Sequence, residues 1–236
     1  MAVEKTETHE FIVTGEPAII TRSAAGNLTI TAGPDGQVHV QVTKRAHGGI
    51  LGHADEHDLD KVHVDVRQAG NRITVEADKR PSSLHGKHIT IDIEITAPSQ
   101  SALDLRLAAG NITIRGISGL ISAKVDAGNM DLTDVMLADR SQLSVNAGNL
   151  TVRGALATGA SLDAQVNAGN ARFTLPRETA AYLDARAQAG NVHVPDWNVS
   201  ITRNFATQAA YGPLGANPAG TLTIRVSAGN ITVEGA

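Results

Sequence analysis

The tripeptide Ala-Gly-Asn occurs eight times in this chain of 236 residues. Counted between glycines, successive copies are separated by 44, 40, 18, 20, 21, 21 and 39 residues, so the long intervals are each close to two of the short ones. A fixed period of about 20 residues is typical of a repeat architecture, in which each unit buries its apolar face against its neighbours. The spacing therefore predicts a stack of about ten coils, some with a degenerate corner.

The residues around each tripeptide alternate between apolar and polar. In residues 101–116, apolar side chains occupy every second position on both sides of the tripeptide: Leu103, Leu105, Leu107, Ile112 and Ile114. Strict alternation is the pattern of a half-buried β-strand, because successive side chains point to opposite faces. Each unit therefore reads as a strand, a corner and a second strand.

The tripeptide supplies residues that suit a tight corner. Glycine adopts positive φ without steric cost, and asparagine tolerates the left-handed region and can hydrogen-bond to neighbouring backbone. If every coil turned at the same place, the asparagines would form a hydrogen-bonded column along the stack. The predicted structural corners are Gly26, Asn27, Gly70, Asn71, Gly110, Asn111, Gly128, Asn129, Gly148, Asn149, Gly169, Asn170, Gly190, Asn191, Gly229 and Asn230.

Two all-β architectures fit these repeats. Gly-Asn is also a two-residue hairpin signal, so a sheet of successive hairpins competes with a single-stranded, β-helix-like β-solenoid. The nearly constant register favours the solenoid, whose parallel crossovers would be right-handed. We predict one elongated β-repeat domain over residues 1–236, with loop insertions near residues 44–61 and 195–220.

Composition argues against several functions. The absence of cysteine excludes disulfides, thiolate metal sites and cysteine catalysis. A net charge of −4 without a basic stripe argues against nucleic-acid binding. No segment approaches the roughly 18 apolar residues of a membrane span, and the first residues lack an apolar signal-peptide core. The chain as given is therefore expected to be cytoplasmic, without direct membrane insertion, and a cell-surface location would require a longer sequence.

The two insertions hold the candidate binding residues. His47, His53, His57 and His63 lie among acidic residues in and beside the first insertion, and imidazoles with carboxylates suit zinc or another transition metal. The alternative is a solvated loop of histidine, glycine and charge.

The second insertion gathers Trp197, Phe205 and Tyr211 in a chain with only 3% aromatic residues. These residues could form a binding loop, or they could belong to a decorated coil that covers an apolar side or end of the stack. No cofactor is predicted from either insertion.

Three segments carry a family resemblance: FIVTGEPAIITRSAAGNLTI, HITIDIEITAPSQSALDLRLAAGNITIRGISG and GTLTIRVSAGNITVEGA. With them the chain resembles the DUF4097 family of bacterial β-strand repeat proteins, which carries the label of adhesin. The resemblance covers nearly the whole chain. It implies a β-solenoid fold, with no established catalytic residues.

The function predicted from these features is a non-catalytic structural or interaction module, adhesin-like, of unestablished ligand. The last strand, ITVEGA, is expected to be uncovered at the end of the stack, and an unpaired strand edge is a template for another chain. A protein partner or self-association through that strand is therefore predicted.

Two alternatives remain open. One is a polysaccharide-acting enzyme of the β-helix type, which would need converging carboxylates; the densest acidic group is Asp104, Asp126, Asp131 and Asp134. The other is an accessory protein of the bacterial envelope-stress response, which rests on analogy.

Overall fold

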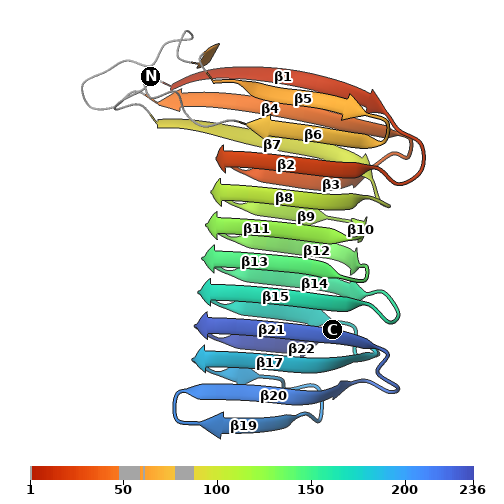
Figure 1. Ribbon diagram of the computed structural model, residues 1–236, viewed down its shortest axis with the longest axis vertical. Coiled ribbons are helices and arrows are strands. Elements are labelled where there is room, and N and C mark those ends of the chain that lie inside the picture. Colours follow the sequence, from red (N-terminus) through yellow and green to blue (C-terminus); the bar gives the residue numbers. More distant parts are fainter. Residues whose placement is uncertain (1, 48–58, 61, 78–87) are drawn as a thin grey trace.

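The computed structural model describes residues 2–47, 59–60, 62–77 and 88–236. Nearly all of them belong to two β-sheets that face each other across a shared apolar core (Figure 1). No helix within this described part is long and apolar enough to cross a membrane.

Sheet A contains, in spatial order, β1 (Ala2–Ile12), β4 (Gln37–His47), β7 (His88–Pro98), β3 (Leu28–Gly33), β9 (Ile112–Arg115), β12 (Met130–Leu137), β14 (Leu150–Leu156), β16 (Ala171–Leu175), β22 (Ile231–Gly235) and β18 (Val192–His193), with β10 (Ser118–Gly119) beside β12. Sheet B contains β19 (Ser200–Asn204), β20 (Thr207–Leu214), β17 (Ala181–Ala189), β21 (Gly220–Ala228), β15 (Ser161–Ala168), β13 (Ser141–Ala147), β11 (Ile121–Ala127), β8 (Ala102–Ala109), β2 (Ala18–Ala25), β6 (Arg72–Ala77) and β5 (Val64–Ala69).

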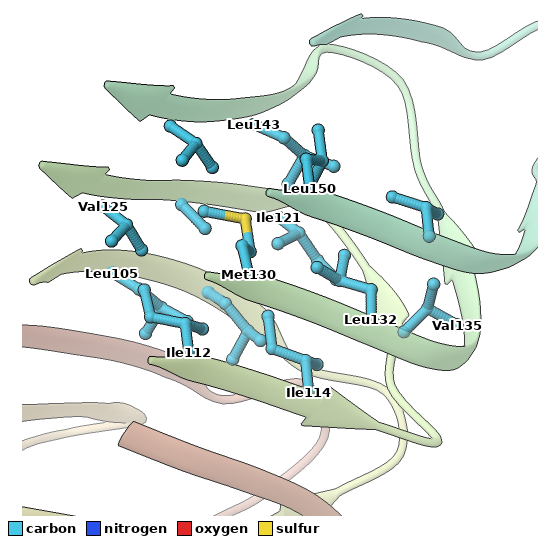
Figure 2. Packing of buried hydrophobic residues seen from close by; sticks show 14 of the residues in the cluster. Leu105, Ile112, Ile114, Ile121, Val125, Met130, Leu132, Val135, Leu143 and Leu150 are labelled. Carbon is cyan, nitrogen blue, oxygen red and sulfur yellow. The ribbon is translucent and has the colours of Figure 1, made fainter. Parts of the chain in front are cut away.

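Seven of the eight tripeptides carry the chain from a strand of sheet B to a strand of sheet A. The strand before each of these corners and the strand after it send alternate side chains into the same core. Figure 2 shows Leu105 and Val125 from sheet B packed opposite Ile112 and Met130 from sheet A. The apolar alternation in the sequence is therefore the inner face of each sheet.

The prediction of an all-β fold is confirmed, but a single-stranded solenoid stack is not what the structure contains. Two large mixed sheets form a sandwich. Strands in the middle are parallel, whereas β1, β4 and β7 at one end, and β17, β20 and β19 at the other, pair antiparallel. Of these pairs, only β19 and β20 form a hairpin, which lies within the second irregular segment. The pairs β1–β4, β4–β7 and β17–β20 each join strands that are separated by two other strands in the sequence.

The eighth tripeptide forms a β-hairpin, which is the turn that the Gly-Asn pair also favours as the alternative to a corner between coils. Gly70 joins β5 to β6 within sheet B, and the two strands pair antiparallel. Its φ is 61°, whereas the other seven corner glycines have φ between 120° and 154°. The same three residues thus make two different turns.

The C-terminal strand is not uncovered, so that prediction is wrong. β22 pairs with β16 on one side and with β18 on the other, and β21 lies between β15 and β17. The last coil is inserted between two coils that precede it in the sequence. Order along the chain therefore differs from order along the stack.

A ladder of asparagines runs along the corners, and each one donates to the next. The Nδ2 and backbone N–H of Asn129 donate to Oδ1 of Asn111 at 3.2 and 3.1 Å, and Asn149 donates to Asn129 in the same way. The ladder continues through Asn170 and Asn230 to Asn191. All these donors point toward one end of the stack.

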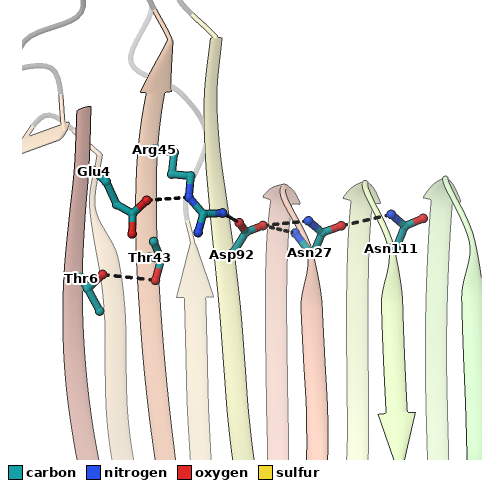
Figure 3. A network of polar contacts seen from close by, with 7 residues as sticks. All are labelled: Glu4, Thr6, Asn27, Thr43, Arg45, Asp92 and Asn111. Carbon is teal, nitrogen blue, oxygen red and sulfur yellow. Dashed lines mark hydrogen bonds and ion pairs between the residues drawn. The ribbon is translucent and has the colours of Figure 1, made fainter. Parts of the chain in front are cut away.

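The ladder ends on a carboxylate. Both the backbone N–H and Nδ2 of Asn27 donate to Oδ1 of Asp92, and Arg45 pairs with the other oxygen of that carboxylate (Figure 3). A hydrogen bond with Glu4, together with the charge of Asp92, raises the pKa of Arg45. An ionised carboxylate suits this position because it accepts the hydrogen bonds from Asn27 and has no N–H group of its own that would need a further acceptor.

Replacing Asp92 by alanine is expected to destabilise the fold by about 1 kcal/mol more than replacing it by asparagine. Asp92→Asn keeps an acceptor oxygen for the two N–H groups of Asn27. Asp92→Ala removes the acceptor of these N–H groups and the partner of Arg45 at this position. Urea unfolding of the two variants measures the difference. Equal stability of the two variants would show that the acceptor at the end of the ladder contributes nothing.

Candidate functional site

A groove of about 580 Å³ lies on the outer face of sheet B, where β5, β6, β2, β8 and β11 run side by side. Its lining includes Ala24, Ala77, Leu107 and Ala108. A second hollow of about 330 Å³ adjoins it and continues across β13 and β15. Volumes of this size fall in the range of small-ligand sites.

Three cations stand in a row across the groove. Arg106 on β8 is in register with Arg22 on β2 and with Lys124 on β11. Neighbouring strands are about 4.8 Å apart, and like charges that face each other across strands destabilise a sheet. Arg106 and Lys124 also line the second hollow, so the row joins the two.

The outer two cations of the row have acidic partners. Arg22 forms an ion pair with the Asp104 carboxylate and donates to its backbone carbonyl at 2.8 Å. The ammonium of Lys124 lies 3.1 Å from Asp126. Arg106, between them, is exposed and has no hydrogen bond or ion pair within the part of the chain that the structure describes.

The acidic residues at the β5 end of the groove are also paired. Arg67 on β5 forms ion pairs with Asp65 and, at 3.2 Å, with Glu76. The hydrogen bond with Asp65 and the charge of Glu76 raise the pKa of Arg67. These two carboxylates are therefore already engaged by a cation other than Arg106.

Of the predicted histidines that the structure describes, one lines this groove. His63 lines it, and His47 ends β4. His53 and His57 lie outside the described residues. Within the described ranges, no group of three or more histidine, aspartate or glutamate side chains is placed to hold a metal ion. The metal site at these histidines stays a prediction.

The three aromatic residues of the second insertion do not converge. Trp197 is partly buried against the core, and its Nε1 donates to the carbonyl of Arg177 at 3.3 Å. Tyr211 lies beneath the guanidinium of Arg186, 5.2 Å from the ring centre. Phe205 is fully exposed at the tip of the β19–β20 hairpin.

The acidic residues considered for catalysis lie on different sheets. Asp104 and Asp126 belong to sheet B, whereas Asp131 and Asp134 belong to β12 of sheet A. The two pairs are therefore on opposite sides of the sandwich. They cannot act together on one glycosidic bond.

The cationic row was missed because its members are far apart in the sequence, and no basic stripe is visible there. Their spacing does carry a signal: Arg22, Arg106 and Lys124 each stand four residues before a corner glycine. Residues at equal distance from stacked corners fall on one cross-strand row. Aligning the repeats on their glycines would have found the row.

Comparisons with known proteins identify no family. No family model and no curated protein matches the chain, so the likeness to the DUF4097 family stays a resemblance.

Several solved structures are similar in arrangement. A Clostridium sporogenes protein described as a "putative cell adhesion protein" is 12% identical, with 98% of this chain and 100% of that chain covered, at a TM-score of 0.49. A "putative adhesin" of Bacteroides fragilis is 14% identical, with 97% of each chain covered, at 0.40. A "putative lipid binding protein" of Parabacteroides distasonis is 11% identical, with 98% and 95% covered, at 0.31. At these values the likeness carries no argument about function.

Proposed function

We propose that this chain is a non-catalytic interaction module that binds a carboxylate-bearing ligand in the groove on sheet B. The observation that supports the proposal is the position of Arg106, which has no partner among the described residues and stands between Arg22 and Lys124. A bound carboxylate would reduce the repulsion among these three cations. It would also give the Arg106 guanidinium an acceptor.

A carboxylate is favoured by the chemistry of arginine. The guanidinium presents a planar fork of N–H donors that matches the two oxygens of a carboxylate. Lys124 on the next strand adds a point charge beside that fork. The neighbouring groove residues Ser122, Gln142 and Ser144 offer uncharged polar groups to the rest of a ligand.

The backbone beneath the row supports precise placement. β8 is paired on both sides, with β2 and with β11, so the strand that carries Arg106 is held within the sheet. Binding residues on regular strands are positioned more accurately than residues on loops. The parallel strands from β8 to β16 form the regular middle part of the two sheets, which would act as a rigid support.

An adhesin-like role agrees with this proposal, because adhesion requires a binding surface and no reaction. The polysaccharide-acting enzyme is disfavoured by the separation of the four aspartates on the two sheets. An accessory role in envelope stress has no feature of the described residues in its favour.

Citrate binding at low ionic strength, followed by isothermal titration calorimetry, tests the groove. Arg106→Gln is expected to weaken binding at least about tenfold, because a charge-assisted hydrogen bond contributes roughly 1.5–3 kcal/mol. Added salt should weaken the binding to the unmodified chain as well.

The matched control is Arg115→Gln. Arg115 is an exposed arginine of sheet A in register with Thr31 and Thr133, and it lies outside the groove. This variant loses the same charge and should bind citrate like the unmodified chain. If both variants weakened citrate binding equally, the loss of net charge would explain the effect and the groove would not be the binding site. Absence of citrate binding by the unmodified chain would also contradict the proposal.

A further inference from the structure

Among the described residues, three of the four sheet edges are protected against pairing with another chain. β1 carries several charged residues: Glu4, Lys5, Glu7 and Glu10. β5 carries Asp65 and Arg67, and β18 has only two residues, with Pro195 close behind. Charges, short length and proline are the usual protections of an exposed strand edge.

The fourth edge, β19, has little protection. Its sequence is Ser-Ile-Thr-Arg-Asn, all five residues are exposed, and Arg203 is its only charge. β20 pairs with one side of β19, and no strand of the described chain pairs with the other side. β19 is therefore the edge best suited to accept a further strand.

The free backbone groups of β19 can be located from its register. Asn204 pairs with Thr207 across a two-residue loop, and the residues that flank such a loop exchange hydrogen bonds. Because antiparallel pairs alternate, Thr202 also bonds to β20. Ile201 and Arg203 therefore direct their N–H and C=O groups away from the sheet.

Ile201 is the last member of a row of apolar residues that runs across neighbouring strands of sheet B, and it lies beyond the part of the row that is buried in the core. Ile224, Ala185, Ala210 and Ile201 stand in register across four strands. The first three are fully buried, whereas Ile201 is 49% exposed. The inner face of sheet B thus continues to its edge with an apolar side chain that lacks a neighbour on the outer side.

A second, independent observation lies at the hairpin tip. Phe205 occupies the first position of the two-residue loop with φ of 46°, a conformation that glycine adopts far more easily. Its side chain is also fully exposed. Backbone strain combined with an exposed large aromatic ring is typical of a residue retained for contact with a partner.

We propose that two copies of this chain associate through β19, antiparallel, around a two-fold axis at Thr202. In this register Ile201 of each copy faces Arg203 of the second copy, so all the outward backbone groups of both residues are paired. Thr202 faces its own equivalent, which is a favourable cross-strand pair. Phe205 comes opposite Val199 of the second copy.

A second copy is favoured over an unrelated strand because β19 is self-complementary. The single charge, Arg203, meets an isoleucine and not its own equivalent. The interface adds a strand to sheet B of each copy, so that the two sheets become one. Isologous contacts of this kind close as a dimer and do not extend into fibres.

The register is tested by introducing either a positive or a negative charge at Ile201. Dimerisation of the full chain is measured by analytical ultracentrifugation over a wide concentration range. Ile201→Lys places a lysine opposite Arg203 twice and should weaken dimerisation about tenfold. Ile201→Glu places a glutamate there and should strengthen dimerisation by a similar factor.

The control variants are Tyr182→Lys and Tyr182→Glu, which make the same charge changes at an exposed residue of β17. They should leave the dimer unchanged. Phe205→Gly should weaken the dimer without lowering the unfolding temperature, because glycine relieves the strained φ. A strict monomer at all concentrations would overturn the proposal, as would Lys and Glu variants at Ile201 that shift dimerisation in the same direction.

Discussion

Gly148→Ala is expected to lower the free energy of unfolding by about 3 kcal/mol or more. The φ of Gly148 is 142°, and a Cβ at this position would overlap the backbone carbonyl of Gly128 on the neighbouring coil. Strained backbone contributes roughly 1–3 kcal/mol and steric overlap in a packed structure a similar amount. Gly128 lies between the paired strands β11 and β12, and its backbone N–H donates to the carbonyl of Ala147 at 2.8 Å, so its carbonyl cannot move away alone.

Gly70→Ala is the matched control, since Gly70 belongs to the same tripeptide. Its φ is also positive, but nothing lies within 4 Å of the position a Cβ would occupy. The expected loss is about 1–2 kcal/mol, from the left-handed conformation alone. Urea unfolding followed by circular dichroism compares the two variants. Equal losses would mean that conformation, and not contact between stacked coils, requires glycine at the corners.

The second large effect concerns Phe173 on β16, which is the largest fully buried side chain among the described residues. Phe173→Ala should destabilise the chain by about 3–5 kcal/mol, because it removes buried apolar surface and leaves a cavity between the two sheets. The unfolding midpoint in urea or on heating measures the loss.

Phe205→Ala is the matched control for the core, because the same atoms are removed from a fully exposed side chain. Its stability should change by less than about 0.5 kcal/mol. A small loss at Phe173, comparable with that at Phe205, would show that the core at β16 repacks around the missing ring.

The local structure was predictable because it depends on local patterns. Alternation around Leu105 and Ile112 indicates two strands, and a glycine between them indicates a corner. The arrangement of the asparagines followed from equal spacing, since equal distances between corners place Asn129 beside Asn111. These features need no knowledge of which coil stacks on which.

The order of the coils was not predictable from the pattern. The tripeptide at Gly229 has the same sequence pattern as the other corners, and this pattern does not depend on whether its coil lies at the end of the stack or in the middle. The turn at Gly70 is likewise made from the same three residues as the corners. In both cases contacts distant in the sequence decide the outcome, and one sequence does not reveal them.

The candidate groove was missed for a related reason. Arg22 and Arg106 are separated by 84 residues, yet β2 and β8 are adjacent. A charge count along the chain cannot show such a row. Aligning the repeats on their corner glycines gives the three cations the same position, and the register of the sheet then shows that β2, β8 and β11 are neighbours.

The placement of the last coil affects how the chain can be assembled. β21 and β22 follow β17 and β18 in the sequence, but in space they separate those strands from β15 and β16. During synthesis, β17 and β18 emerge before their native neighbours exist, so both sheets keep an open gap until residues 220–235 arrive. Nascent chains at that stage present unpaired strand edges on each side of the gap. Folding of this half therefore finishes at its centre, and chains interrupted before residue 220 are expected to be the most prone to aggregate.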